Sequence, residues 1–336
     1  MDIYRTLLVL AASCVMSVVA SAQTPPLKKI KVTIPVPALS FYPLFVGVEK
    51  GYFAKNGLDV EIVSTSGDGP DVDALISGSV DFTVSTPNRL MTAYQQGKPL
   101  LGIMNLGNRM GIDCWMNKEV AAKLDISAAT PLDQRVKSLK GLTVAGTRPG
   151  AFTYLLLMGY ARRFGLEPQK DLQIIGVGGG SSMIPAVEHN QVSMACTGSP
   201  APELAISRGM SVMFSENIAG KDPSYDNFLY GVLYVRPDYA KANADTVRKM
   251  TKSLKESVAF ILDAPDAEQL PILKKSFGGT PDDILMAAAK TNRGMYLRDG
   301  RITDEAVNKA SAFLVQTGAL KTQPPPAAIT TNEYLQ

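Results

Sequence analysis

Two kinds of segment alternate along residues 28–197 of this chain. In one kind the apolar residues recur with the period of a strand, and in the other they recur with the period of a helix. Residues 28–34 alternate between polar and apolar side chains and end at Pro35, as a strand does. Residues 42–55 then carry apolar side chains at helical spacing, and Asn56-Gly57 closes that segment. Because strand and helix continue to alternate, the sequence predicts α/β architecture with mainly parallel sheets.

The alternation occurs twice, over 28–105 and again over 142–197, with a connecting segment at 112–117 between the two series. The expected strands are 28–34, 59–64, 80–85, 99–105, 142–146, 172–177 and 192–197. The expected helices are 42–55, 71–77, 87–96, 151–164, 182–188, 244–262, 269–276, 282–291 and 304–317. Residues 320–336, which contain Pro324-Pro325-Pro326, are expected to form a tail with little packing.

Two lobes are expected, because 336 residues exceed the usual size of a single core. The two series also match in detail. Ala74 to Val80 aligns with Ala186 to Val192, and the strands that follow end at Ser85 and Thr197, each shortly before a proline. Any two strand–helix units look somewhat alike, so this match supports related lobes without requiring them.

The composition argues against several classes of function. Net charge is +3 and no run of Lys and Arg is interleaved with aromatic residues, so nucleic acid is not an expected partner. The one histidine, His189, lies in a polar turn, and no G-x-S-x-G motif accompanies it, so a Ser-His-Asp hydrolase is not expected. We expect no enzyme activity, no metal and no cofactor.

The N-terminal residues have the pattern of an export signal. A short, weakly basic start, Met1 to Arg5, precedes the apolar run Thr6 to Ala20, and Ala20-Ser21-Ala22 supplies small residues for cleavage after Ala22. The apolar run is shorter than the about 20 residues of a membrane-spanning helix. Lipid attachment at Cys14 is the alternative, but the residues before it lack the expected Leu. We expect a soluble exported protein.

Two cysteines, Cys114 and Cys196, remain after such cleavage. They could form a disulfide in an oxidising compartment, or both could be small buried apolar residues. Their spacing does not decide between these possibilities.

The loops that follow the expected strands are the candidate ligand site, because ligands of open α/β sheets lie beyond the carboxyl ends of the strands. These loops are 36–42, 66–69, 85–88, 147–153 and 178–182, with Gly198 and Ser199 after the last strand. The candidate ligand-binding residues are Ser40, Phe41, Tyr42, Gly67, Asp68, Ser85, Thr86, Thr147, Arg148, Gly150, Ala151, Phe152, Thr153, Gly179, Gly180, Thr197 and Ser199.

The loop 147–153 is the strongest candidate for an anion site. It leads into a helix, whose N-terminal N–H groups suit a negative charge, and Arg148 could grip a carboxylate or a sulfonate with two hydrogen bonds. Arg148 could instead face solvent. The segment Ser40-Phe41-Tyr42 would place aromatic rings over an organic ligand or pack as a staple against the helix that follows. Asp68, between two glycines, could be a ligand contact or only a turn former.

Several of these segments together resemble a known family. The stretches PLFVGVEKGYFAKNGLDVEIV, ALISGSVDF, AYQQGKPL and TRPGAFTYLLLMGYARRFGL are similar to the two lobes of solute-binding proteins of ABC importers, in the nitrate, sulfonate and taurine group. That group includes proteins that bind thiamine-pyrimidine precursors. The stretch YLRDGRITDEAVNKASAFLVQTGAL resembles the closing helices of the same family.

The resemblance implies a type II periplasmic binding protein fold, with two α/β lobes around a ligand cleft and the C-terminal helices on lobe one. Lobe one would comprise 27–111 and 226–320, lobe two 112–225, and the Pro-rich tail 321–336. The implied function is capture of a small solute by a monomer in the periplasm that delivers it to an ABC permease. Sulfonate, aromatic carboxylate, nitrate and a neutral pyrimidine stay open as the solute, and Arg148 with the aromatic segment favours an organic anion, an aromatic or alkyl carboxylate or sulfonate. Two alternatives stay open: a protein that binds or makes the thiamine-pyrimidine precursor, and a periplasmic binding protein that feeds a sensor.

Overall fold

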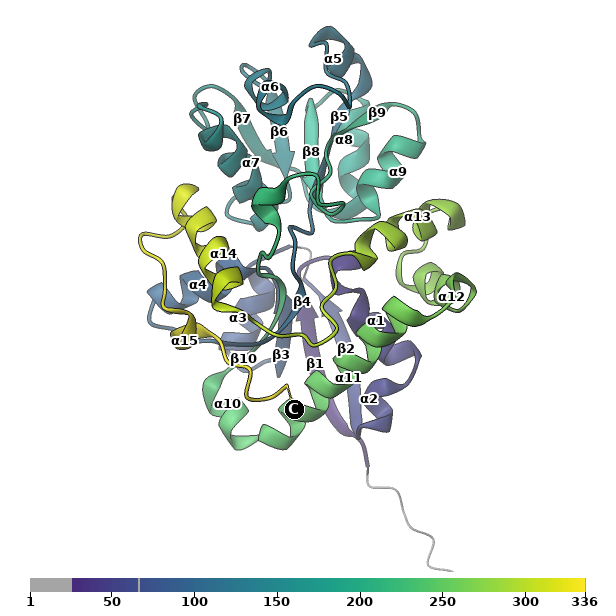
Figure 1. Cartoon of the computed structure of the whole chain (residues 1–336), viewed down its shortest axis with the longest axis vertical. Coiled ribbons are helices and arrows are strands. Elements are labelled where there is room, and N and C mark those ends of the chain that lie inside the picture. The colour runs from purple at the N-terminus through teal and green to yellow at the C-terminus, as the bar shows by residue number, and fades with distance from the viewer. Residues whose placement is uncertain (1–25, 66, 336) are drawn as a thin grey trace, which may run out of the picture.

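The structure is a computed structural model that describes residues 26–65 and 67–335, so the expected export signal lies outside the described residues. The chain forms two lobes, each built on a five-stranded sheet with helices on both faces, and Figure 1 shows one lobe above the other. This confirms the expected pair of α/β lobes. The residue limits predicted for the lobes stay a prediction.

Sheet A belongs to the first lobe and has the strand order β2-β1-β3-β10-β4. Strands β1, β2 and β3 are parallel, and β10 runs antiparallel to both β3 and β4. The strands are β1 (Lys28–Ile34), β2 (Leu58–Ser64), β3 (Phe82–Ser85), β4 (Leu101–Gly107) and β10 (Tyr230–Val235).

Sheet B belongs to the second lobe and has the equivalent order β7-β6-β8-β5-β9, with one antiparallel strand, β5, between β8 and β9. The strands are β5 (Asp113–Asn117), β6 (Thr143–Gly146), β7 (Gln173–Gly176), β8 (Met194–Thr197) and β9 (Ser211–Ser215). We expected 112–117 to be only a connection. It is an inner strand instead: all five residues of β5 are buried, and Cys114, Trp115 and Met116 have partners in both β8 and β9.

Helices occur at every position predicted for the two lobes, and the helices at 118–123, 132–137 and 201–207 were not predicted. The first lobe contains η1 (Leu39–Phe41), α1 (Tyr42–Glu49), α2 (Tyr52–Lys55), α3 (Pro70–Ile76) and α4 (Pro87–Gln95). The second contains α5 (Lys118–Lys123), α6 (Leu132–Lys137), α7 (Phe152–Arg163), η2 (Gly180–Met183), α8 (Ile184–Glu188) and α9 (Ala201–Ser207). The short helix η3 (Pro223–Tyr225) lies in the segment that returns from β9 of the second lobe to β10 of the first. The single helix expected over 42–55 is broken, because Gly51 has a left-handed backbone with φ of +69°.

The C-terminal helices contact both lobes and not only the first. Helix α11 packs on α1 and α2 of the first lobe, but α13 packs against α9, and α14 packs against both α4 and α7. Figure 1 shows α13 and α14 at the level where the lobes meet. These helices are α10 (Pro237–Ala242), α11 (Ala244–Asp263), α12 (Asp266–Ser276), α13 (Asp282–Arg293), α14 (Asp304–Gln316) and α15 (Pro326–Ile329).

The expectation of a loosely packed C-terminal tail is wrong. Ile329 and Tyr334 are buried, and the backbone N–H of Thr331 donates to the carbonyl of Gly102 at 2.9 Å. The hydroxyl of Thr251 donates to the carbonyl of Tyr334. Pro325 is the N-cap residue of α15 and Pro326 is its first residue, and Tyr334 beyond that helix packs into the core of the first lobe.

Cys114 and Cys196 form a disulfide between adjacent strands β5 and β8, where they lie directly opposite each other with Cα atoms 4.1 Å apart. Sequence spacing could not reveal this, because it is the antiparallel insertion of β5 that pairs them. The bond joins residues 82 apart in sequence, and by restricting the unfolded chain it stabilises the folded state by about 4.5 kcal/mol in the chain-entropy model.

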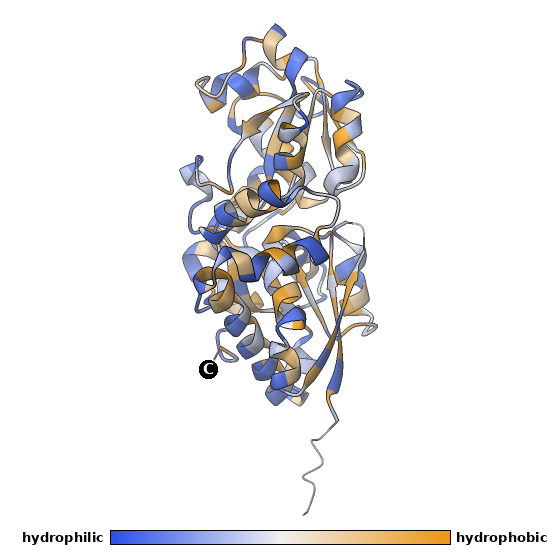
Figure 2. Ribbon diagram, turned by 90° about the vertical axis from the view of Figure 1, so that its right-hand side faces the viewer, coloured by the Kyte–Doolittle hydropathy of each residue, from blue (hydrophilic) through white to orange (hydrophobic). Residues whose placement is uncertain are grey.

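Hydrophobic residues concentrate on the strands, and hydrophilic residues are frequent on the outer helices, as the colours of Figure 2 show. The largest fully buried side chain is Trp115 of β5. Among the residues that the structure describes, no helix has the length and apolar character needed to cross a bilayer.

Candidate functional site

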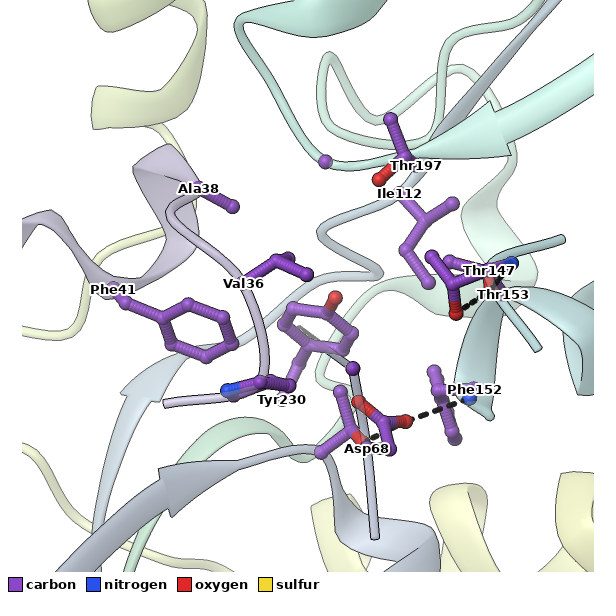
Figure 3. A pocket seen from close by; sticks show the side chains of 14 residues that line it. Val36, Ala38, Phe41, Asp68, Ile112, Thr147, Phe152, Thr153, Thr197 and Tyr230 are labelled. Carbon is purple, nitrogen blue, oxygen red and sulfur yellow. Dashed lines mark hydrogen bonds between the residues drawn. The ribbon is translucent and has the colours of Figure 1, made fainter. Parts of the chain in front are cut away.

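A small cavity lies between the two lobes (Figure 3) and has a volume of about 30 Å³. By size it holds about two water molecules, since one needs roughly 10–15 Å³. Its lining comes from both sheets: Pro35, Val36, Ala38, Phe41, Gly67, Asp68, Thr86, Ile112, Thr147, Phe152, Thr153, Thr197, Gly198 and Tyr230.

The cavity lies where parallel strands end. Val36 follows β1, Asp68 lies beyond β2, and Thr86 follows β3 in the first lobe, while Thr147 follows β6 and Gly198 follows β8 in the second. The carboxyl ends of parallel strands meet at one edge of a sheet, so the two lobes present their strand ends to each other. This arrangement is the one expected for a ligand cleft.

Aromatic rings form much of the apolar wall. Phe41 comes from η1, Phe152 from the first turn of α7, and Tyr230 from the start of β10. In Figure 3 the Tyr230 ring lies close to Val36 and Asp68. The rings of Phe152 and Tyr230 contact each other with centroids 5.8 Å apart, across the two lobes. Such a wall suits the apolar part of an organic molecule.

Asp68 is the only charged residue among the fourteen that line the cavity. Its side chain is buried, and Oδ2 accepts hydrogen bonds from the backbone N–H of Phe152 at 2.8 Å and from the Thr86 hydroxyl at 3.0 Å. Burial raises the pKa of the Asp68 carboxyl, although these two hydrogen bonds and the charges of Arg89 and Arg148 oppose the rise. A carboxylate of the first lobe thus occupies the N-terminus of a helix in the second.

Two arginines flank the Asp68 loop from outside the cavity. Arg89 Nη2 donates to the backbone carbonyl of Asp68 at 3.2 Å. The Arg148 guanidinium lies against Gly67, where a Cβ atom would come within 2.6 Å of Arg148 Nε. Arg148 therefore reaches from the second lobe to the first beside Asp68, but it does not line the cavity that we expected it to line.

A second buried carboxyl, Asp71, lies below Asp68 at the start of α3. It accepts hydrogen bonds from the Ser85 hydroxyl at 2.5 Å and from the backbone N–H of Gly69 at 2.7 Å. Burial, together with the charge of Asp68, raises the pKa of Asp71 to about 6. Ser85, a predicted ligand residue, thus holds Asp71 and does not reach the cavity.

The structure brings eight predicted residues to the cavity: Phe41, Gly67, Asp68, Thr86, Thr147, Phe152, Thr153 and Thr197. Within this group the hydroxyls of Thr147 and Thr153 share a hydrogen bond at 2.9 Å, and the Thr153 hydroxyl accepts from the Thr147 N–H. These contacts fix the start of α7. The roles of these residues in binding stay a prediction.

Other predicted residues lie elsewhere. Tyr42 is buried in the first lobe, where its hydroxyl donates to the Gln269 carbonyl, and the Ser40 hydroxyl donates to the Gly111 carbonyl. Ala151 is the buried N-cap residue of α7. Four positions remain besides Arg148 and Ser85, and all four lie outside the cavity. The Gly150 carbonyl accepts a hydrogen bond from the Asn88 amide, and Gly179 and Gly180 line another crevice of about 270 Å³ against 276–280. The Ser199 hydroxyl donates to Glu203 Oε1 at 2.5 Å.

The predicted residue set omitted Pro35, Val36, Ala38, Ile112, Gly198 and Tyr230. Val36, Ala38 and Gly198 lie on loops that the strand-end rule had selected. Ile112 lies where the chain first crosses between the lobes, so its place depends on the tertiary fold. Tyr230 was missed because β10 was not predicted as a strand, although the apolar run YGVLYV was a signal for one.

Nothing in the described part of the chain forms a group of three or more His, Cys, Asp or Glu side chains that could hold a metal ion. The threonine hydroxyls, the Asp68 carboxylate and the helix N-terminus are suited to reversible polar contacts with a small molecule. The cavity offers no thiol or imidazole for covalent chemistry.

Comparison with known proteins gives this geometry a context. A family model described as the NMT1-like family matches residues 23–271. A solved structure from Bordetella bronchiseptica RB50 is 22% identical, covers 91% of this chain and 95% of its own, and superposes with a TM-score of 0.79. The periplasmic nitrate-binding protein NrtA of Synechocystis PCC 6803 is 19% identical, covers 92% and 87%, and gives 0.71.

The alkanesulfonate-binding protein SsuA of Xanthomonas axonopodis pv. citri, bound to MOPS, is 15% identical, covers 92% and 99%, and gives 0.72. The desulfurization enzyme DSZB also shares the fold, with a lower TM-score of 0.60 at 14% identity. At these identities the likeness establishes the fold, which is that of periplasmic binding proteins with two lobes around a cleft.

Proposed function

The chain belongs to the NMT1-like family, and from that premise we propose that it is the solute-binding component of an ABC importer. Its structural neighbours include a periplasmic nitrate-binding protein, an alkanesulfonate-binding protein and a ligand-binding component of an ABC-type import system. In this proposal the protein captures a small organic solute between its lobes in the periplasm and delivers it to a membrane permease.

The observation that carries the proposal is the cavity shared by the two sheets. Residues from both lobes meet there, so a solute bound between them would favour the closed arrangement. A permease that reads the surfaces of both lobes at once would then distinguish the loaded protein from the empty one.

We propose that the solute is an organic acid, an aromatic or alkyl carboxylate or sulfonate. The support is the N-terminus of α7, where the Phe152 N–H already holds a carboxylate, with Arg89 and Arg148 close by. The rings of Phe41 and Tyr230 would face an organic group. An ion as small as nitrate would leave these rings little to contact.

A thermal-shift panel on the purified mature protein tests the proposal. It compares aromatic carboxylates and sulfonates, alkyl sulfonates, nitrate and aminopyrimidines. A solute present at about 100 times its Kd stabilises the native state by about 2.7 kcal/mol, and an organic acid should be the class that does so. Stabilisation by aminopyrimidines alone would contradict the acid class and favour the thiamine-precursor alternative.

The same samples separate binding from catalysis. If the protein is a binder, the stabilising compound should be recovered unchanged after long incubation at 37 °C with the protein. Chemical conversion of the compound, seen by mass spectrometry, would favour an enzyme on this fold.

A further inference from the structure

The place suited to the solute's acid group is already filled by a side chain of the protein. Asp68 Oδ2 lies 2.8 Å from the Phe152 N–H, and Figure 3 shows this bond crossing from the first lobe to the start of α7. We propose that Asp68 is a built-in occupant of the acid site, which holds the N-terminus of α7 when no solute is bound and is displaced when an organic acid binds. This inference rests on the proposed function.

Space is the first reason for displacement. A cavity of about 30 Å³ does not admit an organic acid as it stands, so binding requires movement of the lining. Removal of the Asp68 side chain from the cavity frees both its volume and the Phe152 N–H, which is the donor that the incoming acid needs.

Charge is the second reason. Asp68 is the sole charged group of the lining, and an anion bound beside it would meet a like charge in a poorly solvated place. The arginines lie behind the Asp68 loop, outside the cavity. An acid that replaces the Asp68 carboxylate would meet the same surroundings that the carboxylate now meets, without the repulsion.

The loop that carries Asp68 is suited to this movement. Gly67 and Gly69 flank it with φ of +134° and +120°, values in the region that favours glycine. When Asp68 leaves, the second group that donates to it, the Thr86 hydroxyl, keeps a hydrogen-bond acceptor. The Thr86 hydroxyl has another acceptor, Asn88 Oδ1, at 2.8 Å, so only the Phe152 N–H needs a new partner.

The sign of proton exchange distinguishes displacement from retention. Displaced into solvent, the Asp68 carboxyl loses the burial that raises its pKa, so binding releases protons. Retained beside a bound anion, its pKa would rise further and binding would take up protons. The titratable or charged groups that face Asp68 from neighbouring elements are Asp71 of α3, Arg89 of α4, Arg148 before α7, and Tyr230 and Tyr234 of β10.

The test uses benzenesulfonate, because a sulfonate stays ionised throughout the pH range and adds no proton exchange of its own. Calorimetry between pH 4.5 and 7.5, in two buffers of different ionisation enthalpy, compares the wild type, Asp68→Asn and Asp73→Asn. Asp73 is exposed on α3, so Asp73→Asn is a control for the same change in net charge.

We expect Asp68→Asn to bind benzenesulfonate about tenfold more tightly than the wild type. This is the gain expected if the Asp68 side chain blocks the acid site in about nine tenths of the wild-type molecules. The wild type and Asp73→Asn should release protons on binding below neutral pH, and Asp68→Asn should release far fewer. Weaker binding by Asp68→Asn would overturn the inference, because Asp68 would then be a direct contact of the solute. Proton uptake by the wild type would overturn it as well.

The outcomes also separate this inference from the proposed function. If benzenesulfonate and the other acids of the panel bind neither the wild type nor Asp68→Asn, the acid class fails and the inference fails with it. If the wild type and Asp68→Asn bind benzenesulfonate equally and without proton exchange, the inference alone fails. In the ligand-free wild type, the Phe152 amide proton should shift as Asp68 titrates, and the shift should be absent in Asp68→Asn.

Discussion

Several buried carboxyl groups lie close to the place where the two lobes meet. Asp68 and Asp71 lie there in the first lobe, and Asp113 lies at the start of β5 in the second. Burial raises the pKa of Asp113 well above its ordinary value, and the charge of Glu203 adds to this. Each of these groups therefore favours the protonated form more in the native state than in the unfolded chain.

The first prediction concerns the pH dependence of stability through Asp71. Its native pKa of about 6 exceeds its ordinary value of 3.8, so its contribution is fully present below pH 4 and is lost as pH rises through 6. We expect the free energy of unfolding to rise as pH falls from 7.5 to 4.5, and Asp71→Asn to remove up to about 3 kcal/mol of that rise. Urea unfolding at several pH values measures both.

Asp73→Asn, on the exposed side of the same helix, is the control and should leave the pH profile unchanged. A wild-type stability that falls steadily from pH 7.5 to 4.5 would contradict the prediction.

The second prediction concerns Arg148, whose guanidinium crosses from the second lobe to the Asp68 loop. Its removal should weaken binding of an organic acid by about 1 kcal/mol, because its charge lies outside the cavity and acts on the acid group from a distance. Arg148→Lys keeps the charge and should therefore recover most of the loss. Calorimetry with the acid selected by the panel measures the effect.

Arg162→Ala is a matched control, because Arg162 lies on α7 and its Nη1 donates to the Gln316 carbonyl, away from the cavity. Equal affinities for Arg148→Ala, Arg162→Ala and the wild type would show that Arg148 has no part in binding.

Elements with strong local signals were predictable from the sequence, and elements that depend on distant partners were not. β1 has its predicted bounds, and α14 begins at the predicted Asp304, where the Thr303 hydroxyl accepts from the Ala306 N–H. β5 looked like a connection because its strand character comes from its neighbours β8 and β9.

The same distinction applies to the cavity. The strand-end rule found its loops, because the rule depends only on parallel order, which strand and helix alternation reveals. It could not find Tyr230, which enters sheet A only after the chain has passed through the whole second lobe. Nor could it show that Asp68 would meet Phe152, since that hydrogen bond joins residues 84 apart in sequence.

The third prediction concerns the contact between α7 and α14, where the Phe313 ring covers Gly159. A Cβ atom at Gly159 would lie 2.4 Å from the ring edge, and Phe313 is held by Phe152, Tyr225 and Phe228. Gly159→Ala should therefore lower the free energy of unfolding by about 1–3 kcal/mol, the usual cost of overpacking, despite the better helix propensity of Ala. Chemical denaturation measures the change.

Gly278→Ala is the control, because a Cβ atom there would meet its nearest neighbour at an ordinary 3.6 Å. Increased stability of Gly159→Ala would mean that the Phe313 ring moves aside freely.

The fourth prediction concerns the whole molecule. If binding a solute closes the lobes, small-angle scattering should show a smaller radius of gyration when the solute is present. Because α13 and α14 already bridge the lobes, the ligand-free protein should open only in part. In the absence of solute, Asp68→Asn should be more open than the wild type, because it lacks the carboxylate that accepts the Phe152 N–H across the two lobes.

Equal radii for ligand-free wild type, ligand-free Asp68→Asn and the solute-bound protein would contradict the predicted closure. The Asp73→Asn variant controls for interparticle repulsion, since it carries the same net charge as Asp68→Asn.

The strand order of sheet A also determines when each lobe can be completed during synthesis. β10 lies between β3 and β4, yet it follows all five strands of sheet B in the chain. While the nascent chain grows, β4 has no strand partner until residues 230–235 are made, whereas sheet B has all its strands once residue 215 is made. The second lobe can therefore reach its native topology first, and the first lobe, although it begins the chain, is finished last.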